Sequence, residues 1–203
     1  MVDPTKIREI IERNCKMLAL KPTRGHLTGV TKARIVDGLR FEIEDGPWKL
    51  TADMPVKAGG DETAPTPGTL GRGALASCIA ISISMWAARL GVPVDALEVE
   101  VRADFDVRGE LGVDDDVPPG YQLIRYLVCI DSPASEDAVA ELIETAERHS
   151  PYVDVQPRQT VVACSASEWQ GGLISMDSTL QRRVQRYGWD KAVGEYNSSQ
   201  HSR

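Results

Sequence analysis

The feature that most constrains the fold is a long apolar segment framed by glycine and proline. Residues 71–88 form the most apolar helical stretch of the chain, and Gly91 suits the left-handed position that commonly ends a helix. An irregular loop rich in Gly, Pro and Thr, residues 55–67, leads into it. The pattern predicts a helix over 69–90, with Thr69 as a possible cap and Cys78 in its middle. A lone thiol on such a helix usually acts as a small apolar side chain, so its surroundings must decide its role.

Length and charge exclude several classes of protein. The 203 residues suffice for one large domain or two small ones, with a sizeable core. The net charge of −7 and the lack of a long Lys/Arg run argue against nucleic acid or an anionic membrane as a partner. No apolar run is expected to span a membrane, because Ser82 and Ser84 dilute the best candidate. The N-terminus shows no apolar signal core, so we expect a cytoplasmic protein with reduced thiols.

The cysteines predict neither a metal site nor a bound cofactor. They are too far apart for a zinc site or a CxxC redox motif, and only three histidines accompany them. The acidic run at 114–116 lacks the spaced ligands, glycine and terminal glutamate of a calcium loop, so a solvated loop is expected there. The four cysteines are Cys15, Cys78, Cys129 and Cys164.

Hydrophobic periodicity predicts a mixed α+β chain. A period near 3.6 and capping signals indicate further helices over 4–18, 136–149 and 175–187. Alternation and turn residues indicate strands over 28–36, 39–44, 48–52, 97–107, 121–130 and 160–164. We therefore divide the chain into an N-terminal helical extension (1–22), a central domain (23–165) and a C-terminal extension (166–203).

The region around Cys78 resembles a known signature. Gly59-Gly60-Asp61, Pro65-Thr66-Pro67, Leu70 and Ala74-Leu75-Ala76-Ser77-Cys78 are similar to the OsmC (osmotically inducible protein C) and organic hydroperoxide resistance superfamily. The order of elements agrees over about 24–164. It includes a helix that ends in His149-Ser150-Pro151-Tyr152. The resemblance makes the central domain OsmC-like. It implies an α+β fold in which antiparallel sheets wrap around central helices of an intertwined homodimer.

The resemblance also implies thiol peroxidase chemistry linked to oxidative stress. In the peroxidase members one cysteine attacks an organic hydroperoxide and a second resolves the sulfenic acid, while an arginine and a glutamate support the thiolate. Cys78 matches the attacking cysteine. An ordinary thiol, with a pKa near ~8.5, is mostly protonated at neutral pH, so a cation is needed. Arg24 and Arg34 are the candidates by analogy, whereas Arg89 lies about three helical turns away.

Two of the four catalytic positions differ from the peroxidase pattern. Ser150 stands where the resolving cysteine is expected, and a hydroxyl cannot form a disulfide. Gly68 stands where the supporting glutamate is expected, with Glu62 nearby as a possible substitute. Cys164 is a possible alternative resolving thiol, and so is Cys129, although both positions are more typical of core residues. Without either, an external small thiol or dithiol must reduce the oxidised cysteine.

Three functions therefore stay open. The leading one is an atypical thiol-dependent hydroperoxide reductase, peroxiredoxin-like in its chemistry, that uses Cys78. The alternative is a non-catalytic protein of the same fold that holds a small apolar, lipid-like ligand. A third, purely structural or interaction role would depend on the two terminal extensions. His149 is expected to interact with carbonyls at a helix end, and Trp86 to lie in the core or the dimer interface.

Overall fold

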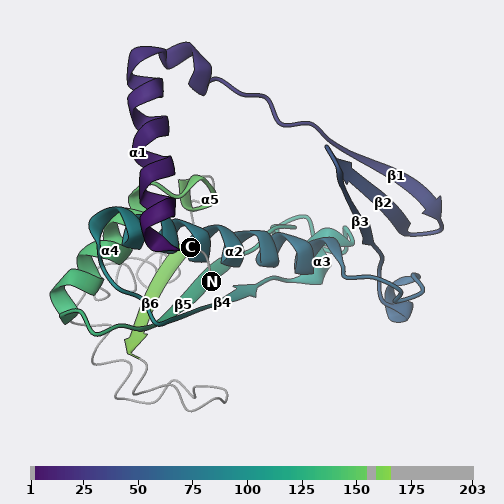
Figure 1. Cartoon of the computed structure of the whole chain (residues 1–203). Coiled ribbons are helices and arrows are strands. Elements are labelled where there is room, and N and C mark those ends of the chain that lie inside the picture. The colour runs from purple at the N-terminus through teal and green to yellow at the C-terminus, as the bar shows by residue number, and fades with distance from the viewer. Residues whose placement is uncertain (1–2, 155–158, 166–203) are drawn as a thin grey trace.

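The computed structural model describes residues 3–154 and 159–165, and it is α+β as expected (Figure 1). The predicted helix at 175–187 and the C-terminal extension 166–203 lie outside the described residues. The helices are α1 (Pro4–Leu20), α2 (Pro67–Leu90), α3 (Val107–Glu110), α4 (Glu136–Arg148) and α5 (Pro151–Asp154), with 3-10 turns η1 (Pro22–Gly25) and η2 (Val56–Ala58). The strands are β1 (Thr31–Asp37), β2 (Arg40–Asp45), β3 (Trp48–Ala52), β4 (Ala96–Asp104), β5 (Leu123–Asp131) and β6 (Gln159–Ser165).

The hydrophobic core lies between the sheet β4-β5-β6 and the two helices α2 and α4. Ile79 and Ile83 of α2, Tyr126 of β5 and Leu142 of α4 are almost fully buried there, as the 3.6-residue and two-residue periods of their segments require. Strand β4 pairs with β5 in antiparallel fashion, but β5 and β6 run parallel. One pairing therefore departs from the all-antiparallel sheets that we expected. The connection through α4 and α5 is the crossover that a parallel pair needs.

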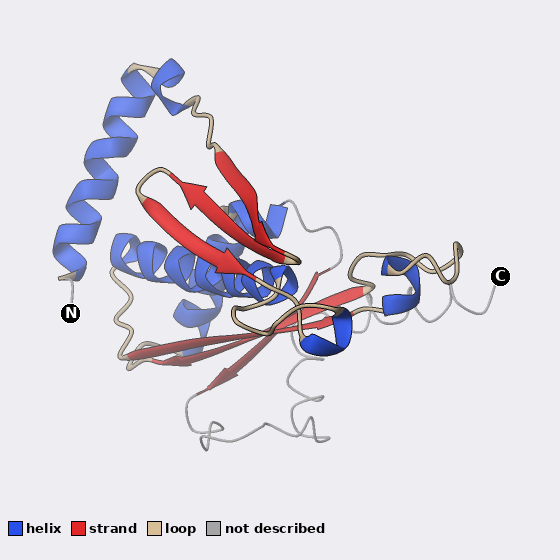
Figure 2. Cartoon of the chain, turned by 90° about the vertical axis from the view of Figure 1, so that its right-hand side faces the viewer, coloured by secondary structure: helices blue, strands red, loops and turns tan. Residues whose placement is uncertain are grey.

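The sheet β1-β2-β3 is antiparallel and lies beyond the N-terminal end of α2 (Figures 1 and 2). Its register gathers apolar side chains on one face, and these are Ala33, Ile35, Phe41, Ile43, Leu50 and Ala52. The opposite face carries a network of ion pairs in which Glu42 and Glu44 meet Arg34 and Lys49. On the apolar face Ile35 is 66% exposed and Leu50 is 54% exposed. Within the described chain nothing covers this face fully.

Helix α1 confirms the predicted N-terminal helix. Asp3 caps it by accepting a hydrogen bond from the backbone N–H of Thr5 (2.9 Å), and Pro4 occupies the first turn. The helix packs against α2 through its first half, since Arg8 reaches Gly91 at the end of α2. No residue of α1 is fully buried, and its far end stands clear of the core (Figure 1). Helix α1 is therefore held more loosely than α2.

Helix α2 begins two residues earlier than predicted because Thr66, not Thr69, is its cap. The Thr66 hydroxyl accepts a hydrogen bond from the Thr69 N–H (3.2 Å), which leaves Pro67 in the first turn. The helix ends at Gly91, whose φ of 72° confirms the predicted left-handed cap. Contrary to our expectation, α2 has the length and apolar composition of a membrane span, although core helices of water-soluble proteins also pass this test. Only 28% of the most apolar 18-residue stretch of α2 is buried in this chain.

The loop that leads into α2 is ordered by the buried carboxylate of Asp53. Its oxygens accept hydrogen bonds from the Thr63 N–H (3.0 Å), the Thr63 hydroxyl (2.8 Å) and the Met54 N–H (2.7 Å). These bonds, the one from the Thr63 N–H foremost, lower the pKa of Asp53 to about 2. Gly60 passes so close to Met54 that an added Cβ would lie 2.1 Å from the Met54 carbonyl oxygen. The glycine of the signature is thus required by backbone contact.

Candidate functional site

Cys78 lies half-buried in the middle of α2, beside the turn that follows α4. Its Sγ is 3.6 Å from the hydroxyl Oγ of Ser150, within hydrogen-bonding range for sulfur, and either atom can donate. Ser150 is 2% exposed. The structure therefore brings together the two residues that the resemblance assigned to the attacking and resolving positions, 72 residues apart in the chain.

Ser150 is held at the junction of α4 and α5. Helix α4 ends at Arg148, and the backbone N–H of Ser150 donates to the carbonyl of Glu147 (3.1 Å). Pro151 then begins α5. The fixed φ of proline suits this first helical position. The hydroxyl is consequently fixed by the exit from one helix and the entry to the next.

Two further contacts join α2 to the same end of α4. The hydroxyl of Ser82 donates to the carbonyl of Ala146 (2.9 Å). The indole of Trp86 stacks on the His149 imidazole, with ring centroids 4.7 Å apart. The Arg89 guanidinium also lies over the Trp86 ring, at 4.6 Å from its centroid. Sequence reasoning missed both contacts, although the four-residue spacing of 78, 82 and 86 on one helix was a signal for a shared face.

A half-buried acid, Glu147, lies in the last turn of α4. The Tyr126 hydroxyl donates to Oε1 of Glu147 at 3.0 Å. Burial raises the pKa of Glu147, and burial also raises that of Tyr126, where the neighbouring carboxylate adds to the effect. The pair anchors the last turn of α4 to the sheet through β5.

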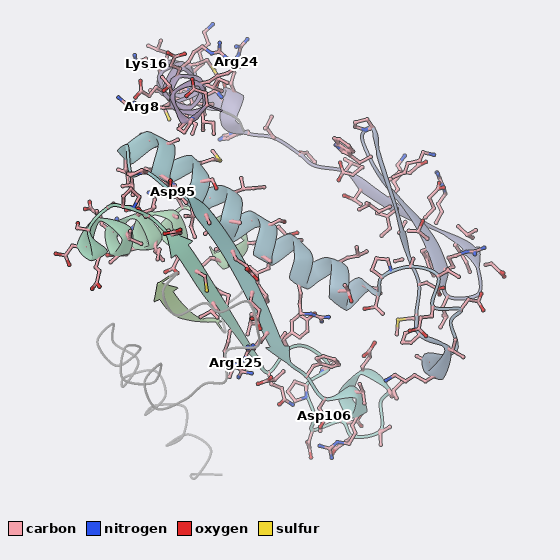
Figure 3. The ribbon with its side chains drawn as sticks, turned by 60° about the horizontal axis from the view of Figure 1, so that its bottom comes forward. Arg8, Lys16, Arg24, Asp95, Asp106 and Arg125 are labelled. Carbon is pink, nitrogen blue, oxygen red and sulfur yellow. The ribbon has the colours of Figure 1, made fainter. Side chains whose placement is uncertain are left out.

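The two arginines assigned by analogy lie away from Cys78 in this chain. Arg24 is in η1 at the end of α1, and Figure 3 looks along that helix with Arg8, Lys16 and Arg24 around its axis. The guanidinium of Arg34 is 2.8 Å from Glu44 and 3.3 Å from Glu42, on the charged face of its sheet. Hydrogen bonding to Glu42 is the first cause of the raised pKa of Arg34. Neither arginine has a bond to Cys78 within the described chain.

Gly68 and Glu62, the two positions considered for the supporting acid, both lie near the start of α2. At Gly68 an added Cβ would lie 3.3 Å from the Arg72 guanidinium and 3.4 Å from the Tyr121 hydroxyl, so these side chains border that space. Tyr121 also donates to the Gly68 carbonyl (3.3 Å). Glu62 has a left-handed backbone, with φ of 56°, in the loop before α2. No bond of Glu62 to Cys78 is present in the described part of the chain.

The cysteines of the described residues divide into free thiols and a disulfide-bonded one. Cys15, exposed on α1, and Cys78 are the free thiols among the described residues. Cys129 takes part in a disulfide, contrary to our expectation that all thiols are reduced. The register of β5 and β6 places Cys164 opposite Cys129. Because the neighbouring Val128 and Ile130 face the core, strand alternation places Cys129 on the sheet face away from α2. This geometry gives no support to a resolving role for Cys164 or Cys129.

The geometry can support thiol chemistry but shows no metal centre. Among residues 3–154 and 159–165, no cluster of His, Cys, Asp and Glu side chains could hold a metal ion.

Comparison with known proteins identifies the family. The model of the OsmC-like protein family matches residues 59–164, which run from the glycine loop through α2 to β6. The chain belongs to the OsmC-like family.

Solved structures agree with this assignment at the level of the fold. An OsmC-like protein from Mycoplasma pneumoniae has a TM-score of 0.58 at 15% identity, covering 68% of this chain and 96% of its own. The organic hydroperoxide resistance protein OsmC from Legionella pneumophila has a TM-score of 0.53 at 17% identity, with the same coverages. An organic hydroperoxide resistance protein from Elizabethkingia anophelis has a TM-score of 0.53 at 13% identity, covering 70% and 97%. No match was found among curated proteins.

Proposed function

We propose that this OsmC-like protein is a thiol-dependent reductase of organic hydroperoxides that reacts through Cys78 alone. The observation that carries the proposal is the 3.6 Å contact between the Cys78 thiol and the Ser150 hydroxyl. Among the described residues the free thiols are Cys78, inside the family-matched segment, and Cys15, outside it. Two structural relatives are organic hydroperoxide resistance proteins, which supports the substrate class.

The chemistry has two stages. The Cys78 thiolate attacks the terminal oxygen of the hydroperoxide, the O–O bond breaks, and the alkoxide takes a proton to leave as an alcohol. The sulfur becomes a sulfenic acid. One molecule of a small thiol then forms a mixed disulfide with Cys78 and releases water, and a second releases the reduced protein and the disulfide of the reductant. A dithiol can perform both reductions.

Ser150 would support the first stage and prevent internal resolution. Its hydroxyl is placed to donate a hydrogen bond to the Cys78 sulfur when the sulfur carries charge, and such charge-assisted bonds are stronger than neutral ones. It has no sulfur, so the sulfenic acid cannot be captured there as a disulfide. We therefore propose an external small thiol or dithiol as the reductant.

We also propose that two copies of the chain form the working unit. The apolar face of β1-β2-β3 and the exposed stripe of α2, with Ile81 60% exposed, lack a full cover in the described chain. Exposed apolar surface of this kind commonly marks an interface. Arg34 lies on the charged face of this sheet, opposite the uncovered face, and Arg24 lies in η1 at the end of α1. They remain candidates for supporting Cys78, by reaching the site of the second copy.

The test compares the wild-type protein with Cys78→Ser, using Cys15→Ser as the matched control. We expect cumene hydroperoxide to be consumed with dithiothreitol or glutathione as reductant, by the wild type and Cys15→Ser but not by Cys78→Ser. Mass spectrometry after one equivalent of peroxide and trapping with dimedone is expected to label Cys78. Absence of consumption with every thiol tested, together with an unlabelled Cys78, would reject the reductase.

A second function, binding of a lipid-like molecule without turnover, is favoured by the exposed apolar side chains beside Cys78. Ile81 and Met85 lie on the same side of α2 as the thiol and remain open in the described chain. Native mass spectrometry distinguishes the two functions. A co-purifying apolar ligand with an unreactive Cys78 supports binding, whereas a ligand-free protein that consumes peroxide supports the reductase.

A further inference from the structure

Three evenly spaced residues of α2 contact the end of α4 and the turn after it. Cys78 meets Ser150, Ser82 bonds to the Ala146 carbonyl, and Trp86 stacks on His149. The spacing of four residues keeps the three α2 side chains on one side of the helix. The three contacts therefore form one row along α2, which we call the seam, and the contact of Cys78 with Ser150 lies at its end.

The turn that carries Ser150 joins α4 to α5, and both helices contact α2. The last carbonyls of a helix have no partner within the helix, and helix ends fray. The backbone N–H of Ser150 donates to the carbonyl of Glu147 in the last turn of α4. His149 is the residue directly before Ser150, and its exposed ring has the Trp86 indole as its stacking partner. Movement of that ring would carry the Ser150 hydroxyl with it.

Trp86 is itself held in one orientation. It packs at the edge of the core cluster, and the Arg89 guanidinium lies 4.6 Å from the centre of its ring. A cation over an indole face is attracted by the ring quadrupole. Aromatic stacking adds an orientation-dependent contribution beyond buried area. The indole is thus fixed by α2 on one side and supplies a fixed surface to the turn on the other.

We propose that Trp86 is a positioning residue: its stack with His149 holds the turn after α4 so that the Ser150 hydroxyl stays against the Cys78 sulfur. The consequence for turnover rests on the proposed reductase function, but the positioning itself does not. The seam passes from Trp86 to His149, and from His149 through one peptide bond to Ser150. Ser82 reinforces the same end of α4 one turn away.

The test measures proximity directly through a disulfide. In a Cys15→Ser, Ser150→Cys background, the introduced thiol and Cys78 react with glutathione disulfide to give a protein disulfide and two molecules of glutathione. The equilibrium constant gives the effective concentration of one thiol near the other. We expect Trp86→Ala to lower this concentration by about tenfold or more, because the turn is released. Trp86→Phe, which retains a stacking ring, is expected to recover most of it.

Matched variants separate positioning from general damage. Trp48→Ala removes an exposed tryptophan of β3 and is expected to change nothing at Cys78. His149→Ala removes the exposed half of the stack, so it tests the same contact even if Trp86→Ala fails to fold. His26→Ala, at an exposed histidine after η1, is its control. Equal effective concentrations in the parent and in His149→Ala would overturn the inference.

Peroxide turnover is read separately in the protein with Ser150 intact. If Trp86→Phe retains turnover and His149→Ala reduces it in parallel with the loss of proximity, the positioning role extends to catalysis. If no variant, including the wild type, consumes peroxide while the disulfide measurements follow the expected order, the reductase function fails and the positioning inference stands. A loss of turnover with unchanged proximity would contradict the inference.

Discussion

The two sheets of this OsmC-like protein differ in what covers them. The sheet β4-β5-β6 is covered on one face by α2 and α4, and the core residues Ile83 and Leu142 are 0% exposed. The sheet β1-β2-β3 has an equally apolar face, but Ile35 and Leu50 remain mostly open in the described chain. The alternation of apolar and polar residues is thus satisfied within one copy in the second half of the protein. In the first half the apolar face stays exposed within one copy, and we propose that a second copy of the chain covers it.

The largest effect, on the free energy of unfolding, is expected at the sheet β4-β5-β6, which α2 and α4 cover. Ile83→Ala removes a fully buried side chain from the contact of α2 with β5 and α4, and such truncations cost about 2–5 kcal/mol of unfolding free energy. Urea unfolding at low protein concentration measures it. The matched variant Ile35→Ala is expected to cost less than about 1 kcal/mol there, because the side chain is exposed in the single copy. Equal losses would show that the two sheets do not differ as described.

The uncovered face provides the next largest effect. If a second copy covers it, Leu50→Asp buries a charge at the interface, and we expect the dimer dissociation constant to rise at least about tenfold (~1.4 kcal/mol). Sedimentation velocity over a concentration series measures this constant. Thr51→Asp, on the charged face of the same strand, is the control and is expected to have little influence. A wild-type protein that stays monomeric at all concentrations would disprove the dimer.

The loop between the two halves is expected to loosen in acid. The pKa of Asp53, about 2 in the folded protein, lies below the unfolded value near 3.9. Its contribution is therefore complete above pH ~4 and is lost as the pH falls from about 4 to 2. The protection factor of the Thr63 amide, which is its exchange rate in the unfolded chain divided by that in the folded protein at the same pH, is expected to fall over that range. In Asp53→Asn the exchange is expected to be fast already at neutral pH, and a wild-type amide that stays protected at pH 2 would contradict this role.

The smallest effect concerns Glu62 in the same loop. Its left-handed backbone suits glycine better, so Glu62→Gly is expected to change the unfolding free energy by less than about 1 kcal/mol. Glu62→Gln keeps the side-chain size but removes the charge. If peroxide turnover falls in both variants while stability holds, the carboxylate supports the reaction as the sequence predicted. Turnover equal to wild type in both would remove Glu62 from the site.

The sequence by itself determined the main helices and strands and the position of Cys78 in the middle of α2. Local signals were sufficient for this, because the cap at Asp3, the glycine after α2 and the periodicity of α4 act within a few residues. The signature around Cys78 also indicated the family that the match to 59–164 shows. Even the pairing of Cys78 with Ser150 followed from the resemblance, although its distance did not.

Only the tertiary structure decided which side chains complete the site. The contacts of Ser82 with Ala146 and of Trp86 with His149 join segments more than sixty residues apart in the chain, and no local pattern specifies such partners. The parallel pairing of β6 likewise depends on how α4 and α5 cross the sheet. Arg34 was assigned by analogy, yet the sheet register pairs it with Glu42 and Glu44. Long-range packing determines these choices, since each depends on the position of a whole helix or sheet rather than on its own residues.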